Sequence, residues 1–273
     1  MLSKAKIKLI RSLELKKNRQ SAGLFVAEGP KVVGDLLSYF RPRFIVATRA
    51  WLAAGAFPPA TEVIEVTEDE LSKASFLKTP QEVLAVFEME GQQDNESMGQ
   101  QMDAGRTQHV DPLTCGLVDL KATLTLVLDD VQDPGNLGTI IRTADWFGIR
   151  RIICSPGTAD AFSPKVVQAT MGSIARVRIC YTDLPSFLAS LPAGTPVYGT
   201  YLEGRNIYHH PLSQGGILIM GNEGNGISPA VSHYVTEKLF IPPYPTDAVT
   251  GESLNVAIAT AITCAEFRRR AGS

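Results

Sequence analysis

Residues 217–227 read Ile-Leu-Ile-Met-Gly-Asn-Glu-Gly-Asn-Gly-Ile, so a short apolar run passes directly into a loop of glycine and asparagine around Glu223. The apolar run is typical of a buried strand. Glycine lets backbone amides approach a ligand closely, but this loop lacks the glycine spacing of a dinucleotide site and the Lys-Ser/Thr of a P-loop. A carboxylate here repels a phosphate and suits a neutral or cationic ligand. The stretch therefore predicts a ligand-binding loop that follows a strand.

Two further segments share this character. Residues 124–128 are apolar and lead into a loop in which Pro134-Gly135 sets a tight turn and Asn136 is expected to cap the next helix. Residues 239–241 are apolar too, and the segment after them reaches Ser253-Leu254-Asn255-Val256, with Ser253 as the expected cap of the last helix. Loops at the carboxyl ends of parallel strands are where α/β proteins bind ligands. We therefore expect one site built from three loops.

The rest of the chain alternates between strand and helix patterns. After residue 120 this alternation predicts a parallel sheet with helices on both faces. The expected strands are 124–128, 151–154, 197–200, 217–220 and 239–241, and the expected helices are 137–147, one opening at Ser163-Pro164, and 253–270. Before residue 90 a weaker α/β alternation places strands at 25–29, 44–47, 63–66 and 83–87 and a helix through 32–37. We expect an N-terminal domain at 1–90, a polar, Gln-rich linker at 91–120 and a second domain at 121–273.

Composition excludes several classes of protein. No run of about 18 apolar residues occurs, so no membrane span is expected. The first residues lack the apolar stretch of a secretion signal, which predicts a cytoplasmic protein. The four cysteines and four histidines are scattered, so we expect reduced thiols and no metal site. The cysteines are Cys115, Cys154, Cys180 and Cys264, and the histidines are His109, His209, His210 and His233.

The charge of the chain is unevenly distributed. Its net charge is −2, but residues 1–50 hold eleven Lys and Arg against three acidic residues, a local charge of +8. Such a basic segment is what binding to a phosphate backbone requires, although it is also compatible with a solvated helical surface. The candidate RNA-binding residues in this segment are Lys16, Lys17, Arg19 and Lys31.

Together and in this order, the three loops resemble the signature motifs of the SpoU/TrmH branch of the SPOUT RNA methyltransferases. The likeness is close over residues 124–270 and looser over the first ninety. It implies a deep C-terminal trefoil knot in the catalytic domain, preceded by a small α/β domain that resembles an RNA-binding ribosomal protein. In residues 161–173, which also match, Gln168 stands where many relatives carry arginine.

The resemblance also implies roles for individual residues. Arg142 would contact the phosphate and ribose of the target and help to remove the 2′-hydroxyl proton, whereas from the residues alone it is a surface arginine that pairs with Asp145 or Asp133. An arginine is an unlikely free base, so stabilisation of the developing alkoxide is the role we expect. The candidate catalytic residues are Arg142, Asn136, Glu223, Ser253 and Asn255. The candidate contacts to S-adenosylmethionine are Thr200, Gly221, Glu223, Gly226, Ile241 and Leu254.

These observations lead to one expected function and two alternatives. We expect a ribose 2′-O-methyltransferase that uses S-adenosylmethionine and acts on RNA. Ribosomal RNA is the substrate we expect. A tRNA 2′-O-methyltransferase of the same fold and a non-catalytic RNA-binding member remain open. A homodimer is expected because the last helix combines small residues with apolar ones. These are Ala257, Ala259, Ala261 and Ala265, with Ile258, Ile262 and Phe267.

Overall fold

The computed structural model describes residues 2–54, 57–58, 61–89, 120, 122–245 and 253–271. Apart from Leu120, the predicted linker at 91–120 lies outside the described residues. The chain divides into two compact units, one formed by residues 1–103 and 160–176 and the other by residues 104–159 and 177–273. Residues 160–176 thus belong with the first unit, whereas the sequence placed them inside the second domain. The boundaries at 90 and 121 stay a prediction.

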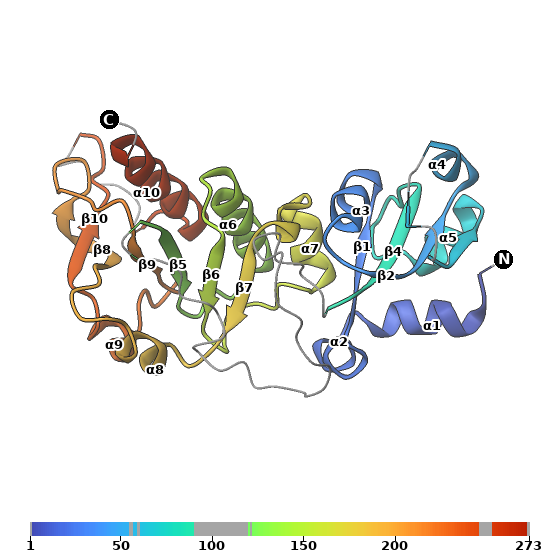
Figure 1. Cartoon of the computed structure of the whole chain (residues 1–273), viewed down its shortest axis with the longest axis horizontal. Coiled ribbons are helices and arrows are strands. Elements are labelled where there is room, and N and C mark those ends of the chain that lie inside the picture. The colour runs from blue at the N-terminus through green and yellow to red at the C-terminus, as the bar shows by residue number, and fades with distance from the viewer. Residues whose placement is uncertain are drawn as a thin grey trace, which may run out of the picture. The chain divides into compact units, whose positions relative to one another are not determined.

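The second unit is built on a parallel sheet with the strand order β10-β8-β9-β5-β6-β7 (Figure 1). The strands are β5 (Leu124–Leu128), β6 (Arg151–Cys154), β7 (Arg178–Tyr181), β8 (Val197–Asn206), β9 (Gly216–Met220) and β10 (Glu237–Phe240). Strands β5 and β9 are buried along their whole length, as expected for the centre of a sheet covered on both faces. The predicted parallel α/β sheet is confirmed.

Helices cover both faces of this sheet. They are α6 (Pro134–Trp146), α8 (Leu184–Ala189), α9 (Pro229–Ser232) and α10 (Val256–Ala271). Figure 1 shows α6 and α10 on one side of the strands and α8 and α9 on the other. Phe187 of α8 and Val231 of α9 pack in one cluster with Val127, Ile153 and Ile219 of the strands. Each helix thus buries an apolar stripe against the pleated surface.

Helices α6 and α10 run side by side in the same direction. At one end the side-chain amide of Asn255 donates to Oδ1 of Asn136 at 2.9 Å, and at the other end Arg268 Nε donates to the carbonyl of Phe147 at 2.7 Å. Phe267 of α10 is 2% exposed and meets the ring of Tyr198 in β8 edge-on, with 5.0 Å between the ring centroids. The last helix is therefore fixed to both α6 and the sheet.

The first unit contains a smaller sheet with the order β1-β4-β2-β3. Its strands are β1 (Leu24–Glu28), β2 (Pro42–Ala47), β3 (Val63–Glu65) and β4 (Val83–Glu88). Its helices are α1 (Lys4–Ser12), α2 (Lys16–Ala22), α3 (Pro30–Leu37), α4 (Arg49–Ala54), α5 (Glu68–Ala74) and α7 (Pro164–Thr170). A 3-10 turn follows at Ser173–Ala175. Strand β4 is antiparallel to β1 and β2, and β2 is parallel to β3. The small α/β domain predicted for the N-terminus is confirmed.

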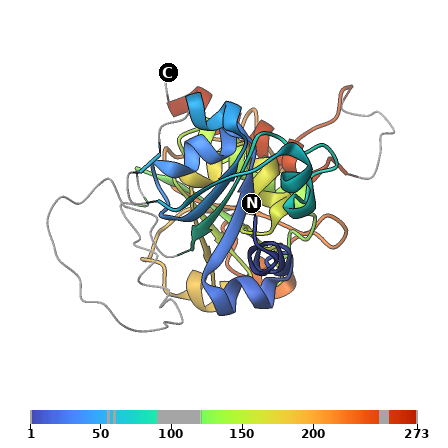
Figure 2. The ribbon, with the colours of Figure 1, turned by 90° about the vertical axis from the view of Figure 1, so that its right-hand side faces the viewer.

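Two apolar layers cover the two faces of this sheet. On one face Ile10 and Leu13 pack with Val26, Val46 and Val86 of the strands. On the other face the rings of Phe25, Phe40 and Phe87 contact one another. Figure 2 shows α1 almost end-on and α3 on the other side of the strands of this unit.

Residues 160–176 join the first unit through specific contacts. Asp160 accepts two hydrogen bonds from the guanidinium of Arg19, at 2.5 and 3.2 Å, and the ring of Phe162 lies 4.8 Å from that of Phe25. Ser163 caps α7 through the amide of Val166, and Pro164 is its first residue, as predicted.

Two strands differ from the prediction. Strand β7 was not predicted, because Arg178–Tyr181 at the edge of the sheet is only half-buried and lacks an apolar run. Strand β8 continues to Asn206 rather than ending at residue 200, because Arg205 and Asn206 pair with Leu239 and Phe240 of β10 beyond a register shift.

Candidate functional site

The three predicted loops all follow strands of one parallel sheet, so they lie at the same edge of it. Strand β5 ends at Leu128, β9 at Met220 and β10 at Phe240, and β8 is paired to β9 up to Gly199. Gly221 and Ile241 therefore stand at the carboxyl ends of β9 and β10, and Thr200 lies in β8 just beyond its last pair with β9, at the edge where α/β sheets bind ligands.

The first loop is held by two aspartates. Asp129 is 6% exposed and its Oδ2 accepts a 2.7 Å hydrogen bond from the amide of Ser228, which ties this loop to the glycine loop. Asp133 caps α6, because its Oδ1 accepts the amide of Asn136 at 2.8 Å and Pro134 begins the helix. The prediction that Asn136 is the cap is therefore wrong. Asn136 lies inside the first turn, and this leaves its side chain free to contact other loops.

The glycine loop is a tight structure organised by Asn222. Its backbone exchanges two hydrogen bonds with Gly226, at 2.9 and 3.0 Å, and its Oδ1 accepts the amides of Gly224 and Asn225. Its side-chain amide donates to the carbonyl of Asp130 at 2.7 Å. A Cβ on Gly221 would stand 2.2 Å from the backbone of Gly226, so this close approach requires glycine.

Glu223 joins the glycine loop to the first loop. Its carboxylate accepts the amides of Gln132 at 3.3 Å and Asp133 at 3.2 Å, and the side-chain amide of Asn136 at 3.0 Å. Partial burial acts to raise the pKa of Glu223, but these hydrogen bonds outweigh it and place the pKa below its ordinary value. Glu223 is therefore ionised at neutral pH and carries a fixed negative charge at the edge of the sheet.

The third segment completes a chain of hydrogen bonds. The side-chain amide of Asn255 donates to Oδ1 of Asn136, and Oδ1 of Asn255 accepts the amides of Ala257 and Ile258, at 3.0 and 3.3 Å. Asn255 thus caps α10, and the prediction that Ser253 does so is wrong. Ser253 is exposed and lies before the helix. Asn136 connects Glu223 to Asn255, so residues from all three loops form one network.

Arg142 does not join this network. It lies in the third turn of α6, about 9 Å along the helix axis from Asn136, and its side chain is exposed. In the part of the chain that the structure describes, no carboxylate lies within 4.0 Å of its guanidinium, so the predicted pairing with Asp145 or Asp133 is absent there. Its charge remains available to a partner outside the described residues.

The predicted cofactor residues differ in their surroundings. Thr200 is half-buried, and its hydroxyl lies 3.6 Å from the sulfur of Met220. Ile241 is half-buried at the end of β10, and Leu254 is 51% exposed just before α10. Gly226 adopts a φ of +67°, a conformation that glycine reaches without strain. Apart from Thr200, which lies in β8, these residues and Glu223 lie on the segments that follow the strands at this edge.

The predicted RNA-binding residues divide into two kinds. Lys16 and Lys17 are exposed, and Lys31 is exposed and ion-paired with Asp35 at 3.0 Å. Arg19, in contrast, is 2% exposed, and its guanidinium donates to the carbonyls of Leu13 and Glu14 as well as to Asp160. The assignment of Arg19 to an RNA-binding surface is therefore wrong, because its side chain is enclosed within the first unit.

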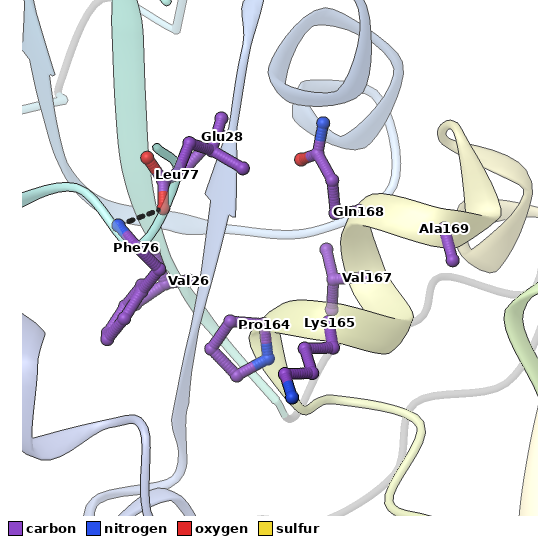
Figure 3. Close-up of a pocket in the computed structure, with 9 residues that line it drawn as sticks. All are labelled: Val26, Glu28, Phe76, Leu77, Pro164, Lys165, Val167, Gln168 and Ala169. Atoms are coloured by element: carbon purple, nitrogen blue, oxygen red, sulfur yellow. Dashed lines mark hydrogen bonds between the residues drawn. The ribbon is translucent and has the colours of Figure 1, made fainter. Parts of the chain in front are cut away.

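Gln168 lines a pocket of about 340 Å³ within the first unit. Figure 3 shows the pocket between α7, which supplies Lys165 and Gln168, and Glu28 with Phe76 on the other side. Glu28 is 6% exposed, and its carboxyl group accepts hydrogen bonds from Ser75 Oγ and from the amide of Phe76. Burial raises the pKa of Glu28 despite these two donors. Its hydrogen bonds tie β1 to the segment after α5, which indicates a structural role.

Several further features bear on the sequence predictions. Cys154 and Cys264 are buried free thiols, but Cys180 is disulfide-bonded, so the prediction of reduced thiols is wrong for Cys180. Among the described residues, no group of three or more His, Cys, Asp or Glu could hold a metal ion. No helix in the described ranges is both long and apolar enough to cross a membrane.

Sequence reasoning missed the residues that hold the loops. Asp129, Asp133 and Asn222 fix the loop backbone, yet none was a candidate. A signal for Asp129 was available, because it directly follows a fully buried strand. For Asp133 the signal was the Asp-Pro pair, which matches a cap followed by proline at the first helical position.

Comparison with known proteins agrees with this geometry. The model of the SpoU rRNA methylase family matches residues 123–265, and that of the MRM3-like substrate binding domain matches residues 4–85. The first match covers more than half of the chain, which therefore belongs to the SpoU rRNA methylase family.

Individual relatives extend over nearly the whole chain. The 23S rRNA (guanosine(2553)-2′-O)-methyltransferase RlmP of Bacillus subtilis is 32% identical over 96% of both chains. A TrmH-family structure from Porphyromonas gingivalis is 43% identical, with a TM-score of 0.81 over 99% of both chains. The AdoMet-bound rRNA methyltransferase of Sinorhizobium meliloti is 32% identical, with a TM-score of 0.79 over 99% of this chain and 96% of that one.

Proposed function

We propose that this chain transfers a methyl group from S-adenosylmethionine to a ribose 2′-hydroxyl of ribosomal RNA. The observation that carries the proposal is the hydrogen-bonded chain Glu223–Asn136–Asn255, which joins three loops at the carboxyl edge of the sheet in a SpoU-family protein. The ribosomal substrate is supported by RlmP, the full-length relative whose name states a 23S rRNA target. A tRNA substrate or a loss of activity has no comparable observation in its favour.

The residues at this edge fit the proposed cofactor. S-adenosylmethionine supplies an electrophilic methyl group on a cationic sulfonium. The ionised carboxylate of Glu223 gives the site a negative charge, and the close backbone approach at Gly221 excludes a side chain there. Thr200 would offer a hydroxyl to the cofactor, and the exposed Leu254 would offer it an apolar surface.

The chain's own groups would position the RNA and stabilise charge. Arg142 projects from the exposed side of α6, free of any carboxylate in the described ranges, so it can hold a phosphate next to the target ribose. The same guanidinium would stabilise the alkoxide that develops as the 2′-hydroxyl releases its proton to solvent, while its oxygen takes the methyl group and the sulfonium leaves as a neutral thioether. Because Asn136 and Asn255 hold α6 against α10, Arg142 is presented from a fixed helix, which favours precise orientation of the two reactants.

A calorimetric titration tests the cofactor site. We expect S-adenosylmethionine or its demethylated product to bind with one site per chain. Thr200→Val should weaken binding several-fold, because a hydrogen-bonding hydroxyl is replaced by a methyl group of the same shape. Thr182→Val is the matched control, since Thr182 follows β7 at the far end of the same sheet. Absence of any heat or thermal shift with either compound would exclude the proposed cofactor.

We further propose a homodimer formed through α6 and α10. In α10, Val256, Ala257 and Phe267 are buried within the chain, whereas Ile258 is 51% exposed. Trp146 at the end of α6 is 85% exposed, and Leu254 adds a third exposed apolar side chain. Apolar groups of this size on neighbouring helices favour a two-fold interface of more than about 1,000 Å².

Light scattering checks this oligomeric state. The intact protein at micromolar concentration should have the mass of a dimer, and Ile258→Glu should shift it to a monomer while the fold is retained. A monomer mass for the unmodified protein would contradict the proposal.

Two further features belong to the proposed function. We propose the trefoil knot that the resemblance implies. We also propose a location in the cytoplasm, where bacterial ribosomes are assembled.

A further inference from the structure

A second pocket of the first unit lies at the edge of the small sheet where three strands end. Its volume is about 530 Å³. Strands β1, β2 and β3 point in the same direction, and the residues just after them, Pro30, Thr48 and Glu68, all line the pocket. The carboxyl end of a strand is where α/β structures place ligands. This pocket belongs entirely to the first unit.

One buried polar atom in the pocket wall has no partner. Thr48 is 9% exposed, its amide donates to the carbonyl of Glu82 at 2.8 Å and its carbonyl accepts the amide of Leu52 at 3.1 Å. Its hydroxyl oxygen is buried without a hydrogen bond to any described residue. Buried hydroxyl groups are almost always paired. A rotation of about 120° around the Cα–Cβ bond moves the hydroxyl to another staggered position, where a ligand in the pocket would supply the missing partner.

The lining has the chemistry of a site for a flat ring with polar edges. Pro30, Leu71 and Pro80 are apolar, whereas Glu68, Asp69 and Glu82 are exposed and add carboxylates to the lining. Carboxylates only accept hydrogen bonds at neutral pH, so they repel phosphate and favour N–H donors. They do not form a group that could hold a metal ion among the described residues. A neutral ring with amino groups therefore fits this lining better than a phosphate does.

Basic residues are the sequence neighbours of three residues in this lining. Lys31 follows Pro30, Arg49 follows Thr48, and Lys78 precedes Thr79, and all three side chains are exposed. Lys31 is ion-paired with Asp35, whereas Arg49 and Lys78 have no ion-pair partner in the described ranges. Cations next in sequence to the lining residues, together with carboxylates in the lining, match an RNA segment whose phosphates lie outside and whose base lies inside.

We propose that this pocket receives one unpaired nucleobase of the RNA and prefers a base with an amino group over uracil. The inference rests on the proposed function to the extent that the ligand is RNA. The acceptors Glu68, Asp69 and Glu82 take the amino hydrogens of guanine, adenine or cytosine, whereas uracil presents two carbonyl oxygens and a single N–H. The pocket lies in the segment that matches a substrate-binding domain. The expected preference for a base comes only from the residues that line the pocket.

The test uses the full-length protein and hairpin RNAs that differ only in one bulged nucleotide. Fluorescence anisotropy should show that G, A or C bulges bind about 10-fold more tightly than a U bulge, as expected for one well-formed hydrogen-bonded base contact. The double variant Asp69→Asn, Glu82→Gln should bind all four bulges equally. Glu14→Gln, an exposed carboxylate outside the pocket, should keep the preference. Lys78→Ala should weaken all four complexes alike and reduce their salt dependence.

A second variant separates this role from a structural one. Thr48→Val removes the unpaired hydroxyl, so it should raise the melting temperature and also reduce the preference among the bulges. Equal affinity of the unmodified protein for all four bulges, or no RNA binding, would overturn the pocket proposal. Methyl transfer by that protein would still support the proposed function. If the unmodified protein showed a base preference but neither bound the cofactor nor transferred a methyl group, the pocket proposal would stand. The proposed enzymatic function would then be refuted.

Discussion

Two arginines show that charge in the sequence does not determine the role of a side chain. Arg19 lies in the basic N-terminal segment, yet it is buried against Asp160 and two backbone carbonyls. Arg142 lies in the acidic part of the chain, yet its guanidinium is exposed and has no carboxylate partner in the described ranges. Arg19 is buried because the fold supplies acceptors for its guanidinium. Arg142 is available to RNA because no described carboxylate lies near it.

The proposed role of Arg142 predicts a selective loss of activity. Arg142→Ala should lower methyl transfer by about 100-fold or more, because a preorganised charge is removed from the transition state. S-adenosylmethionine affinity, measured by calorimetry, should stay close to that of the unmodified protein. Arg150→Ala is the matched control, since Arg150 is also exposed and lies just before β6, at the opposite edge of the sheet. Unchanged turnover in Arg142→Ala would make it an ordinary surface arginine.

At the scale of elements, the start of α10 both caps a helix and connects loops. Asn255→Ala should lower the free energy of unfolding by about 1–2 kcal/mol, because two backbone amides lose their acceptor and Asn136 loses a donor. Ser253→Ala should leave stability nearly unchanged. Urea unfolding of the two variants side by side measures this difference. Equal losses, or a larger loss for Ser253→Ala, would restore Ser253 as the cap.

The other end of α10 is fixed by a cluster of charges. Glu266 is 6% exposed and accepts hydrogen bonds from Arg269 at 2.7 and 2.8 Å and from Arg270 at 2.6 Å. Arg270 also donates to the carbonyls of His210 and Ile207. The hydrogen bonds from Arg269, together with Arg270, lower the pKa of Glu266 to about 2. The cluster therefore ties the end of the helix to the segment after β8.

This lowered pKa predicts a dependence of stability on pH. Glu266→Gln should cost about 2 kcal/mol at pH 7, where the ionised carboxylate is hydrogen-bonded. Because the pKa is lower in the folded state than in the unfolded one, the stabilisation is complete above the ordinary glutamate value of 4.5 and is lost as pH falls toward about 2. The free energies of unfolding of Glu266→Gln and of the unmodified protein should therefore converge as pH falls from 4.5 toward about 2. Glu203→Gln, an exposed glutamate in β8, should show no such convergence.

The elements show which features a sequence can predict. Strands β5 and β9 were predicted because both are mostly apolar, and they are buried along their whole length. The caps were misplaced because Asp133 and Asn136, like Ser253 and Asn255, are all good capping residues, and only the true first turn distinguishes them. The contact between Asn136 and Asn255 spans 119 residues of sequence, and the one between Arg19 and Asp160 spans 141, so neither follows from local pattern.

At the scale of the whole molecule, each unit has its own sheet with a candidate site at the carboxyl ends of its strands. In the second unit the loops contain a fixed carboxylate and an exposed arginine, which suit a cationic methyl donor and a phosphate. In the first unit the pocket contains an unpaired hydroxyl and three carboxylates beside basic residues, which suit a base and its backbone. The two kinds of site correspond to the two reactants of the proposed reaction.

Mapping of ribose methylation on total RNA tests the central claim most directly. In a strain that lacks this chain, one 2′-O-methyl group should be missing from the ribosomal RNA. The unmodified protein should restore it, and a well-folded Arg142→Ala variant should not. An unchanged pattern of ribose methylation, or a missing methyl group located on a base, would contradict the assignment of this chain as a ribosomal RNA 2′-O-methyltransferase.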